Sequence, residues 1–278
     1  MSRSNPNENL KHPATKWIEY HGGGEKGGTF SYYDKEKVNE DGSRGANVSL
    51  GAKFSFMFLD QTYSVTGWNE PSHSGVYANE VKDISNGIFT VKAFKGQDSH
   101  VGNWTSIKDR VKSMGGKFTC NIYIAIKTKQ GLELSVVQLK GAAFAKWNKF
   151  KKNSGDKALE IGAVKIASHL DGVKGAVKFK TPIFELIPEV TAESNNSAIE
   201  LDKQLQEFLA SKIVTPTTPT VEEVATPPVQ IQEEPRTSLK PERTEMGVVD
   251  MDENELEPVQ QEFSSFDDFD DDTEELPF

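Results

Sequence analysis

The feature that most limits the fold of this chain is a break in composition after Pro188. Residues 189–278 contain one of the 22 Gly, eight of the 13 Pro, and none of the Trp or Tyr residues. A segment so rich in Pro and so poor in aromatic side chains cannot bury enough apolar surface to offset the entropy lost on folding. We therefore expect one folded body, over residues 17–188, followed by a largely unfolded C-terminal region.

Charge divides at the same point. Residues 1–188 hold 27 of the 32 Lys and Arg residues but only 18 of the 42 Asp and Glu residues. Residues 1–188 carry a net charge of +9 and residues 189–278 carry −19, which together give −10 for the chain. The body can therefore bind a polyanion, and the acidic region can compete for the same surface.

Alternation of apolar and polar residues predicts many short strands. The clearest spans residues 117–127, where Phe118, Cys120, Ile122, Ile124 and Ile126 alternate with Lys117, Thr119, Asn121, Tyr123, Ala125 and Lys127. We expect the first set to face the core and the second to face outward. Further strands are predicted at 17–20, 29–33, 52–58, 62–66, 76–81, 88–94, 132–139 and 174–185. Asp60-Gln61 is read as a turn, and the Gly-rich segment 22–28 as a hairpin loop rather than a phosphate-binding loop.

Three segments have helical spacing. One opens after Asn103 and stops at Gly115, and a second covers residues 142–152. A third, in region 189–214, is predicted from the capping box Ser197-x-x-Glu200, and its apolar face would either dock on the body or bind a partner or a second copy. Together these elements indicate a mainly β protein, a small, closed, antiparallel barrel with one or two helices. Residues 1–16 are expected to be flexible, and residues 215–262 to form a disordered Pro- and Glu-rich linker.

The acidic tip, residues 263–278, carries the most specific signal. Its last twelve residues hold seven acids and no base, and end in Leu276-Pro277-Phe278. With Asp270-Asp271-Asp272, this end resembles the C-terminal tip of bacterial and phage single-stranded-DNA-binding proteins (SSBs), although Thr273-Glu274-Glu275, and Leu where Ile is commoner, depart from that pattern. The resemblance implies an OB-fold body and a tip that binds partners through Asp267, Asp268, Phe269, Asp270, Asp271, Asp272, Glu274, Glu275, Leu276, Pro277 and Phe278.

The resemblance also implies a function. We expect sequence-independent binding and protection of single-stranded DNA during replication, recombination and repair, with the tip recruiting DNA-processing enzymes. The long body favours a phage origin. Two alternatives stay open: a recombination mediator or strand-annealing protein, and an acidic-tailed chaperone or DNA mimic. The sequence leaves self-association undecided.

Binding of single strands requires cations along the phosphates and flat rings on which bases can stack. Outward positions of the predicted strands and loops supply both kinds, although each aromatic could instead pack within the barrel. The candidates are Tyr32, Tyr33, Tyr63, Trp68, Tyr77, Lys117, Tyr123, Lys127, Lys174, Lys178 and Lys180.

Several other classes of function are disfavoured. Cys120 is the only cysteine, so neither an intrachain disulfide nor a Cys-rich zinc site is expected. The five His residues are scattered without metal-binding or catalytic spacing, so we expect no enzyme, metal or cofactor. No apolar run reaches about 18 residues, which predicts a soluble protein of a bacterial or phage-infected cytoplasm.

Overall fold

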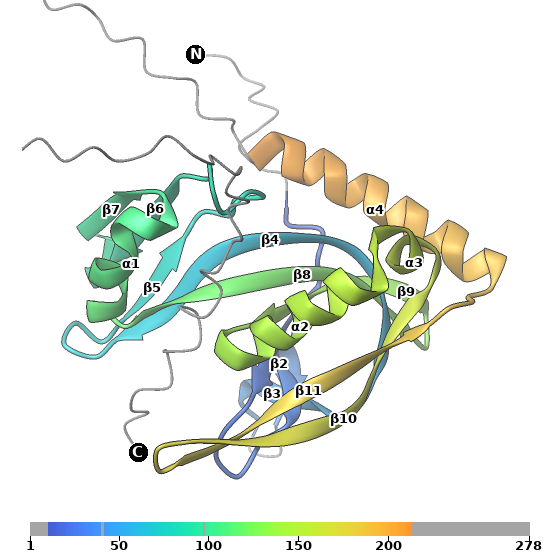
Figure 1. Ribbon diagram of the computed structural model, residues 1–278, viewed down its shortest axis with the longest axis horizontal. Coiled ribbons are helices and arrows are strands. Elements are labelled where there is room, and N and C mark those ends of the chain that lie inside the picture. Colours follow the sequence, from blue (N-terminus) through green and yellow to red (C-terminus); the bar gives the residue numbers. More distant parts are fainter. Residues whose placement is uncertain (1–10, 40–41, 97, 213–278) are drawn as a thin grey trace, which may run out of the picture. The chain divides into compact units, whose positions relative to one another are not determined.

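The computed structural model describes residues 11–39, 42–96 and 98–212 (Figure 1). The predictions for residues 1–10, for the linker and for the acidic tip lie outside them. The described chain starts with an antiparallel meander of β1 (Lys16–His21), β2 (Thr29–Val38) and β3 (Arg44–Gly51). The Gly-rich segment 22–28 joins β1 to β2, as predicted.

Two long strands cross the body, β4 (Ser55–Asn69) and β8 (Gly116–Thr128), and β9 (Gly131–Leu139) pairs with the other side of β8. The predicted turn at Asp60-Gln61 is wrong. A register shift between Phe58 and Asp60 marks a β-bulge, which bends one continuous strand instead of ending it. The even-numbered residues of β8 from Phe118 to Ile126 are buried in the main core, as the alternation predicts.

A smaller unit, which we call the arm, is inserted between β4 and β8. It consists of β5 (Ser74–Ala78), β6 (Phe89–Ala93), the 3₁₀ turn η1 (Phe94–Gly96), β7 (Asp98–Gly102) and α1 (Trp104–Ser113). Helix α1 begins where predicted because the side chain of Asn103 accepts a hydrogen bond from the backbone N–H of Ser106 (3.0 Å). At its end, Gly115 has φ +82°, and a Cβ there would lie 2.1 Å from the carbonyl oxygen of Trp68. Glycine is therefore required where the arm returns to β4.

After β9 come α2 (Gly141–Ser154), α3 (Asp156–Ile161) and a long hairpin of β10 (Ala163–Lys174) and β11 (Val177–Ile187). Trp147 anchors α2 to the core: its indole N–H donates to Gln61 Oε1 (3.1 Å), and its ring lies 5.2 Å from that of Phe184. Helix α2 matches the predicted segment 142–152.

The predicted single strand at 174–185 is wrong at its start. Gly175, with φ +57°, and Ala176 form a two-residue turn between β10 and β11. Val173 pairs with Lys178, and Lys174 pairs with Val177. Directly opposed residues share a face, so Lys174 lies on the opposite face from Lys178 and Lys180, and the three do not form the predicted row.

Helix α4 (Ala192–Lys212) packs on the outer face of β8 and β9. It starts before the predicted capping box because Thr191 Oγ1 already accepts the N–H of Ser194 (3.2 Å). Leu205 and Phe208 of α4 lie in a buried cluster with Tyr123. Of the two alternatives for this helix, the structure therefore contains the one in which its apolar face docks on the body.

The prediction of a flexible N-terminus is wrong for residues 11–16. The N–H of Thr15 donates to the carbonyl of Leu134 (3.0 Å), and Ala14 is buried in the cluster beneath α4. Thr15 thus extends the contact of β1, which starts at Lys16, with β9. The short polar sequence of residues 11–15 gives no sign of this, because the packing partner is a helix almost 200 residues away.

The described strands form one sheet in the order β3-β2-β1-β9-β8-β4-β5-β6-β7, with β10 beside the start of β4 and β11 beside β10. All pairs are antiparallel except β1 with β9. The body is mainly β, as predicted. The sheet is open, however, because β1 ends at His21 and the chain continues as the Gly-rich loop, so that β11 pairs with β10 and not with β1. Among the described residues, the backbone contacts between β11 and that loop are the isolated bridge Gly23–Phe179 and a hydrogen bond from Lys180 N–H to Gly22 O (2.7 Å).

Candidate nucleic-acid interface

Three of the predicted contact residues share one face of the sheet at the arm. Thr66 of β4 lies opposite both Tyr77 of β5 and Lys117 of β8, so these side chains project on the same side. Trp68 is two residues from Thr66 and joins them on that face. Lys92 of β6 lies opposite Tyr77. We call Lys92, Tyr77, Trp68 and Lys117 the cross-strand row.

The two rings of the cross-strand row are accessible. Trp68 and Tyr77 are 50% and 51% exposed, and they are diagonal neighbours, with their Cα atoms about 7–8 Å apart. Gly75 lies directly opposite Trp68, and a Cβ at Gly75 would meet no atom within 4 Å. The missing side chain therefore leaves space beside the indole. Two half-exposed rings at this separation can each accept one base of an extended strand.

Cations lie at both ends of the cross-strand row. Lys92 is exposed on β6, and Lys117 is half-buried on β8. Lys140, just after β9, is a neighbour of Lys117: burial lowers the pKa of its ammonium, Glu19 opposes the shift, and the charge of Lys117 adds to it. The rings are thus flanked by positive charge that a phosphate backbone can neutralise.

Sequence reasoning missed Lys92 and Lys140. Lys92 could have been found, since Phe89, Val91 and Ala93 alternate with it on a short strand. Lys140 has no such signal, because it follows β9 and only the pairing of β9 with β8 brings it to Lys117.

A hydrogen-bonded network occupies the same face between the cross-strand row and α4. The carboxylate of Glu80 accepts from Thr62 Oγ1 (2.7 Å), Asn121 Nδ2 (3.0 Å) and the hydroxyl of Tyr123 (2.6 Å). Gln138 Nε2 donates to Asn121 Oδ1 (3.0 Å). Three donors aimed at one carboxylate leave it few open acceptor positions, so the arrangement supports a structural role for Glu80.

Two of the predicted stacking residues are buried. Tyr123 does lie on the outer face of β8, but α4 and His12 cover it, and His12 stacks on its ring with centroids 5.9 Å apart. Tyr63 faces the core, and burial raises its pKa to about 12. The prediction that these two rings meet bases is therefore wrong in this arrangement, because neither offers a free face.

Tyr32 is the third ring that does not fit the prediction. It lies opposite Ile18 and packs, partly buried, against the main core, with Lys16 Nζ 5.5 Å from its ring centre. Tyr33, the next residue, points the other way and is 57% exposed, but it lies on β2, the middle strand of the meander, apart from the cross-strand row. Lys127 is exposed at the opposite end of β8, ten residues or about 33 Å along the strand from Lys117.

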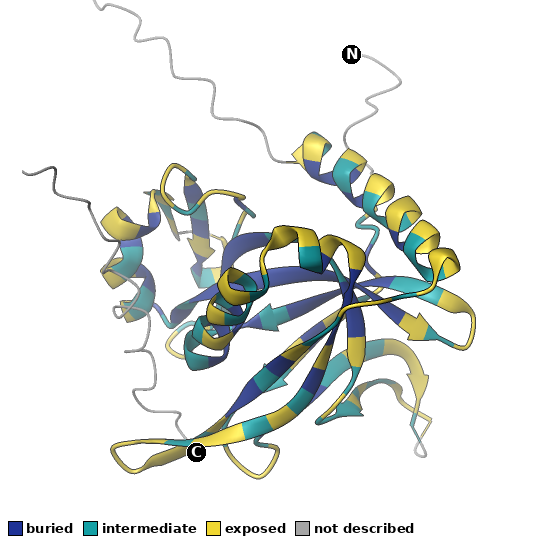
Figure 2. Ribbon diagram, turned by 45° about the vertical axis from the view of Figure 1, so that its right-hand side comes forward, coloured by how far each residue is buried: buried dark blue, intermediate teal, exposed yellow. Residues whose placement is uncertain are grey.

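The predicted lysines near the C-terminal end of the body lie on the β10–β11 hairpin, apart from the cross-strand row. Lys174, Lys178 and Lys180 are all exposed. Midway along the hairpin, where His169 pairs with Pro182, the His169 ring stacks on Tyr20 with ring centres 5.9 Å apart. Burial, followed by the charges of Lys180 and Lys53, lowers the pKa of His169. The hairpin therefore carries a second set of cations, on a tip that Figure 2 shows as exposed.

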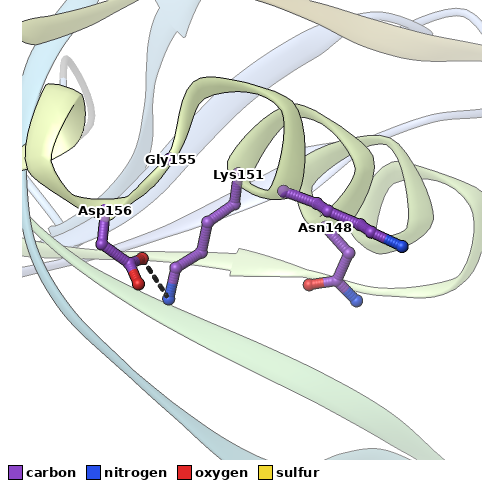
Figure 3. Close-up of a pocket in the computed structure, with 5 residues that line it drawn as sticks. Asn148, Lys151, Gly155 and Asp156 are labelled. Carbon is purple, nitrogen blue, oxygen red and sulfur yellow. Dashed lines mark ion pairs between the residues drawn. The ribbon is translucent and has the colours of Figure 1, made fainter.

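A shallow depression lies beside α2 and α3 (Figure 3), lined by Asn148, Lys151, Lys152, Gly155 and Asp156. Lys151 Nζ is 3.9 Å from the exposed carboxylate of Asp156. Two ammonium groups facing one carboxylate and one amide provide neither a nucleophile with its base nor a set of metal ligands. We assign this depression no catalytic role.

The predicted partner-binding residues, 267–278, lie outside the described residues. Among the helices that the structure describes, none combines the length and hydropathy needed to cross a membrane.

Comparison with known proteins adds no further evidence. No family model, curated protein or solved structure matches this chain. The candidate interface therefore rests on its own geometry.

Proposed function

We propose that this protein binds single-stranded DNA without sequence preference and protects it during replication, recombination and repair. The observation that carries the proposal is the cross-strand row, in which Trp68 and Tyr77 lie exposed on one sheet face between Lys92 and Lys117. Rings stack on any base and ammonium groups neutralise any phosphate. This combination therefore favours binding of single-stranded DNA whatever its sequence. The net charge of +9 on residues 1–188 supports the same conclusion.

The order of the connections supports an OB-fold for the body, elaborated by the meander and the arm. Strands β4, β8 and β9 are followed by helices α2 and α3 and then by β10 and β11, with β10 returning to pair antiparallel with β4. This order supports a five-stranded, partly open Greek-key barrel, a fold in which the connection between the first two strands and that between the last two bind oligonucleotides. Those connections here are the arm and the tip of the β10–β11 hairpin, which project on the same side in Figures 1 and 2.

Recruitment of DNA-processing enzymes is the second part of the proposal. It rests on the SSB-like acidic end, in which Phe278 offers a ring for an apolar pocket and the acids before it offer partners for Arg or Lys. Ring burial at about 1.5–3 kcal/mol and one charged hydrogen bond at about 1.5–3 kcal/mol would give micromolar affinity at best. Several tips on one coated strand would raise it through effective concentration. In this proposal the protein is not an enzyme and acts in a bacterial or phage-infected cytoplasm.

The deciding experiment is a fluorescence titration of the full chain with oligo-dT. Trp68→Ala and Tyr77→Ala should each weaken binding by about 1–3 kcal/mol, or roughly 5- to 150-fold, without changing the fold. Tyr33→Ala is the matched control, since Tyr33 is equally exposed but lies outside the cross-strand row. Absence of binding by the unaltered chain in low salt, or equal losses for all three variants, would refute the proposed interface.

A further inference from the structure

The tip of the β10–β11 hairpin exposes aliphatic side chains that no described segment covers. Val173 is 67% exposed, Leu170 48% and Val177 38%. The pairing of Val173 with Lys178, and of Lys174 with Val177, places one valine and one lysine on each face of the tip. Each face of the tip thus carries an apolar and a cationic side chain. Such a tip fits a partner in which an apolar part lies between negatively charged groups.

The hairpin is braced near its tip, at Lys180, in the fourth residue pair from the turn. The N–H of Lys180 donates to Gly22 O (2.7 Å), and the Tyr20 hydroxyl donates to the carbonyl of Lys180 (2.8 Å). Further out, Phe179 lies opposite Gly172, and a Cβ at Gly172 would come within 2.5 Å of its ring, so the ring lies across the glycine. An aromatic ring over a cross-strand glycine fills the gap that the glycine leaves in the strand pair. The hairpin is therefore built to hold its tip out from the sheet, as Figure 1 shows.

We propose that this tip is a wedge that enters the end of a DNA duplex where a bound single strand begins. The proposal rests on the proposed function, since the cross-strand row would hold the adjoining single strand. Aliphatic side chains inserted at a base step unstack it, and the flanking lysines would meet the phosphates on either side. Asp171, opposite Lys180, is the one acid within residues 170–180, so the charge of the tip favours nucleic acid.

A second copy of the chain is a poorer occupant. A two-fold contact between two such tips would bring identical lysines together, which is unfavourable. An anionic lipid surface has compatible chemistry, and the experiment is designed to detect it.

The test uses a forked duplex with the fluorescent base 2-aminopurine at the last base pair, and the double variant Val173→Thr/Val177→Thr. Threonine keeps the shape and strand preference of valine but adds a hydroxyl. The unaltered protein should increase the 2-aminopurine emission, and the double variant should lose more than half of that increase while binding oligo-dT as before. Val38→Thr is the control, because Val38 is 60% exposed on β2, outside the hairpin.

Each other outcome has a distinct meaning. An undiminished emission increase in the double variant would overturn the wedge. An equal loss on oligo-dT would show that the tip contacts the single strand instead, and would also overturn it. Binding to anionic vesicles that depends on Val173 and Val177, without an effect at the fork, would assign the tip to lipid. Failure of the unaltered chain to bind oligo-dT would refute the proposed function separately.

Discussion

The outer face of β4 and β8 is one surface with two different ends. At the arm, Trp68 is half-exposed and Lys117 half-buried, and both form part of the cross-strand row. Toward the other end, Tyr123 follows Lys117 on the same alternating positions of β8, but it is fully buried beneath α4. The sequence pattern is the same at both ends, and only the covering element differs.

This comparison separates two properties that alternation is often taken to predict together. Alternation determines which side of the strand a residue occupies, since successive side chains point to opposite faces. It does not determine whether that side meets water, since another segment can dock on it. The four predictions below test whether the covered end is structural and the open end functional, starting with the largest expected effect.

Loss of packing under α4 should have the largest effect on stability. Leu205→Ala removes a fully buried side chain from the cluster with Tyr123, and should lower the free energy of unfolding by about 2–5 kcal/mol. Urea denaturation would measure this, with Ile199→Ala, 45% exposed on the same helix, as the control that should change little. A lower affinity for oligo-dT in folded Leu205→Ala protein would contradict the division between the two ends.

The Glu80 network lies between the two ends and should have an intermediate effect. Glu80→Ala removes the acceptor of the Thr62 and Tyr123 hydroxyls and one of the two acceptors of Asn121 Nδ2, and unmade buried hydrogen bonds cost about 1–3 kcal/mol each. We expect a clear loss of stability in urea. Glu185→Ala is the control, because its ion pair with Lys165 is exposed and worth about 0–1 kcal/mol. Equal stability of the two variants would show that the network does not support the sheet face.

Lys117 should affect DNA binding and not stability. Lys117→Gln leaves one phosphate of the bound strand without its cation, and should therefore reduce the slope of log affinity against log salt by about 0.7. Lys127→Gln removes a lysine from the same face of β8, at the other end, and should leave the slope unchanged. The pair is measured by oligo-dT titration at several salt concentrations. A reduced slope for both lysines would mean that the strand runs the whole length of β8.

The smallest effect should be a pH dependence of the covered end. Burial lowers the pKa of His12, whose Nδ1 accepts the N–H of Ala14 (3.1 Å) and whose Nε2 lies 3.4 Å from the Tyr123 hydroxyl oxygen. The His12 imidazole therefore takes up a proton more readily in the unfolded chain than in the folded one. Its contribution to the free energy of unfolding is complete above about pH 6.5 and is lost as pH falls through the lower pKa of the folded state. Urea unfolding between pH 7 and 5 should show a weaker pH dependence for His12→Gln. His169 shifts in the same direction, and its contribution should persist in that variant.

Much of the fold was predictable because its signals are local. The alternation of β8 and the apolar spacing of α1 and α2 depend on interactions between near neighbours, and these elements lie where predicted. Strand β7 was missed because Asp98-Ser-His-Val-Gly102 contains one apolar residue, and it is a strand only because β6 supplies its hydrogen bonds. The apparent strand across Gly175 was a hairpin because a two-residue turn does not interrupt alternation.

The candidate site was predictable only in part. Trp68, Tyr77 and Lys117 were chosen from the sequence, but so were Tyr32, Tyr63 and Tyr123, whose rings are wholly or partly buried. An aromatic residue suits a core as well as a stacking surface, so its type and spacing do not decide between the two.

The amino-acid sequence by itself determined where the composition breaks, how charge divides, and which residues of each long strand share a side, because these follow from residue type and from the two-residue repeat of an extended chain. Only the tertiary structure decided which part of that side α4 covers, and that Lys92, Tyr77, Trp68 and Lys117 meet on four neighbouring strands. Those outcomes depend on pairings between residues far apart in the chain, and such pairings are chosen by the free energy of the whole body and not by any one segment.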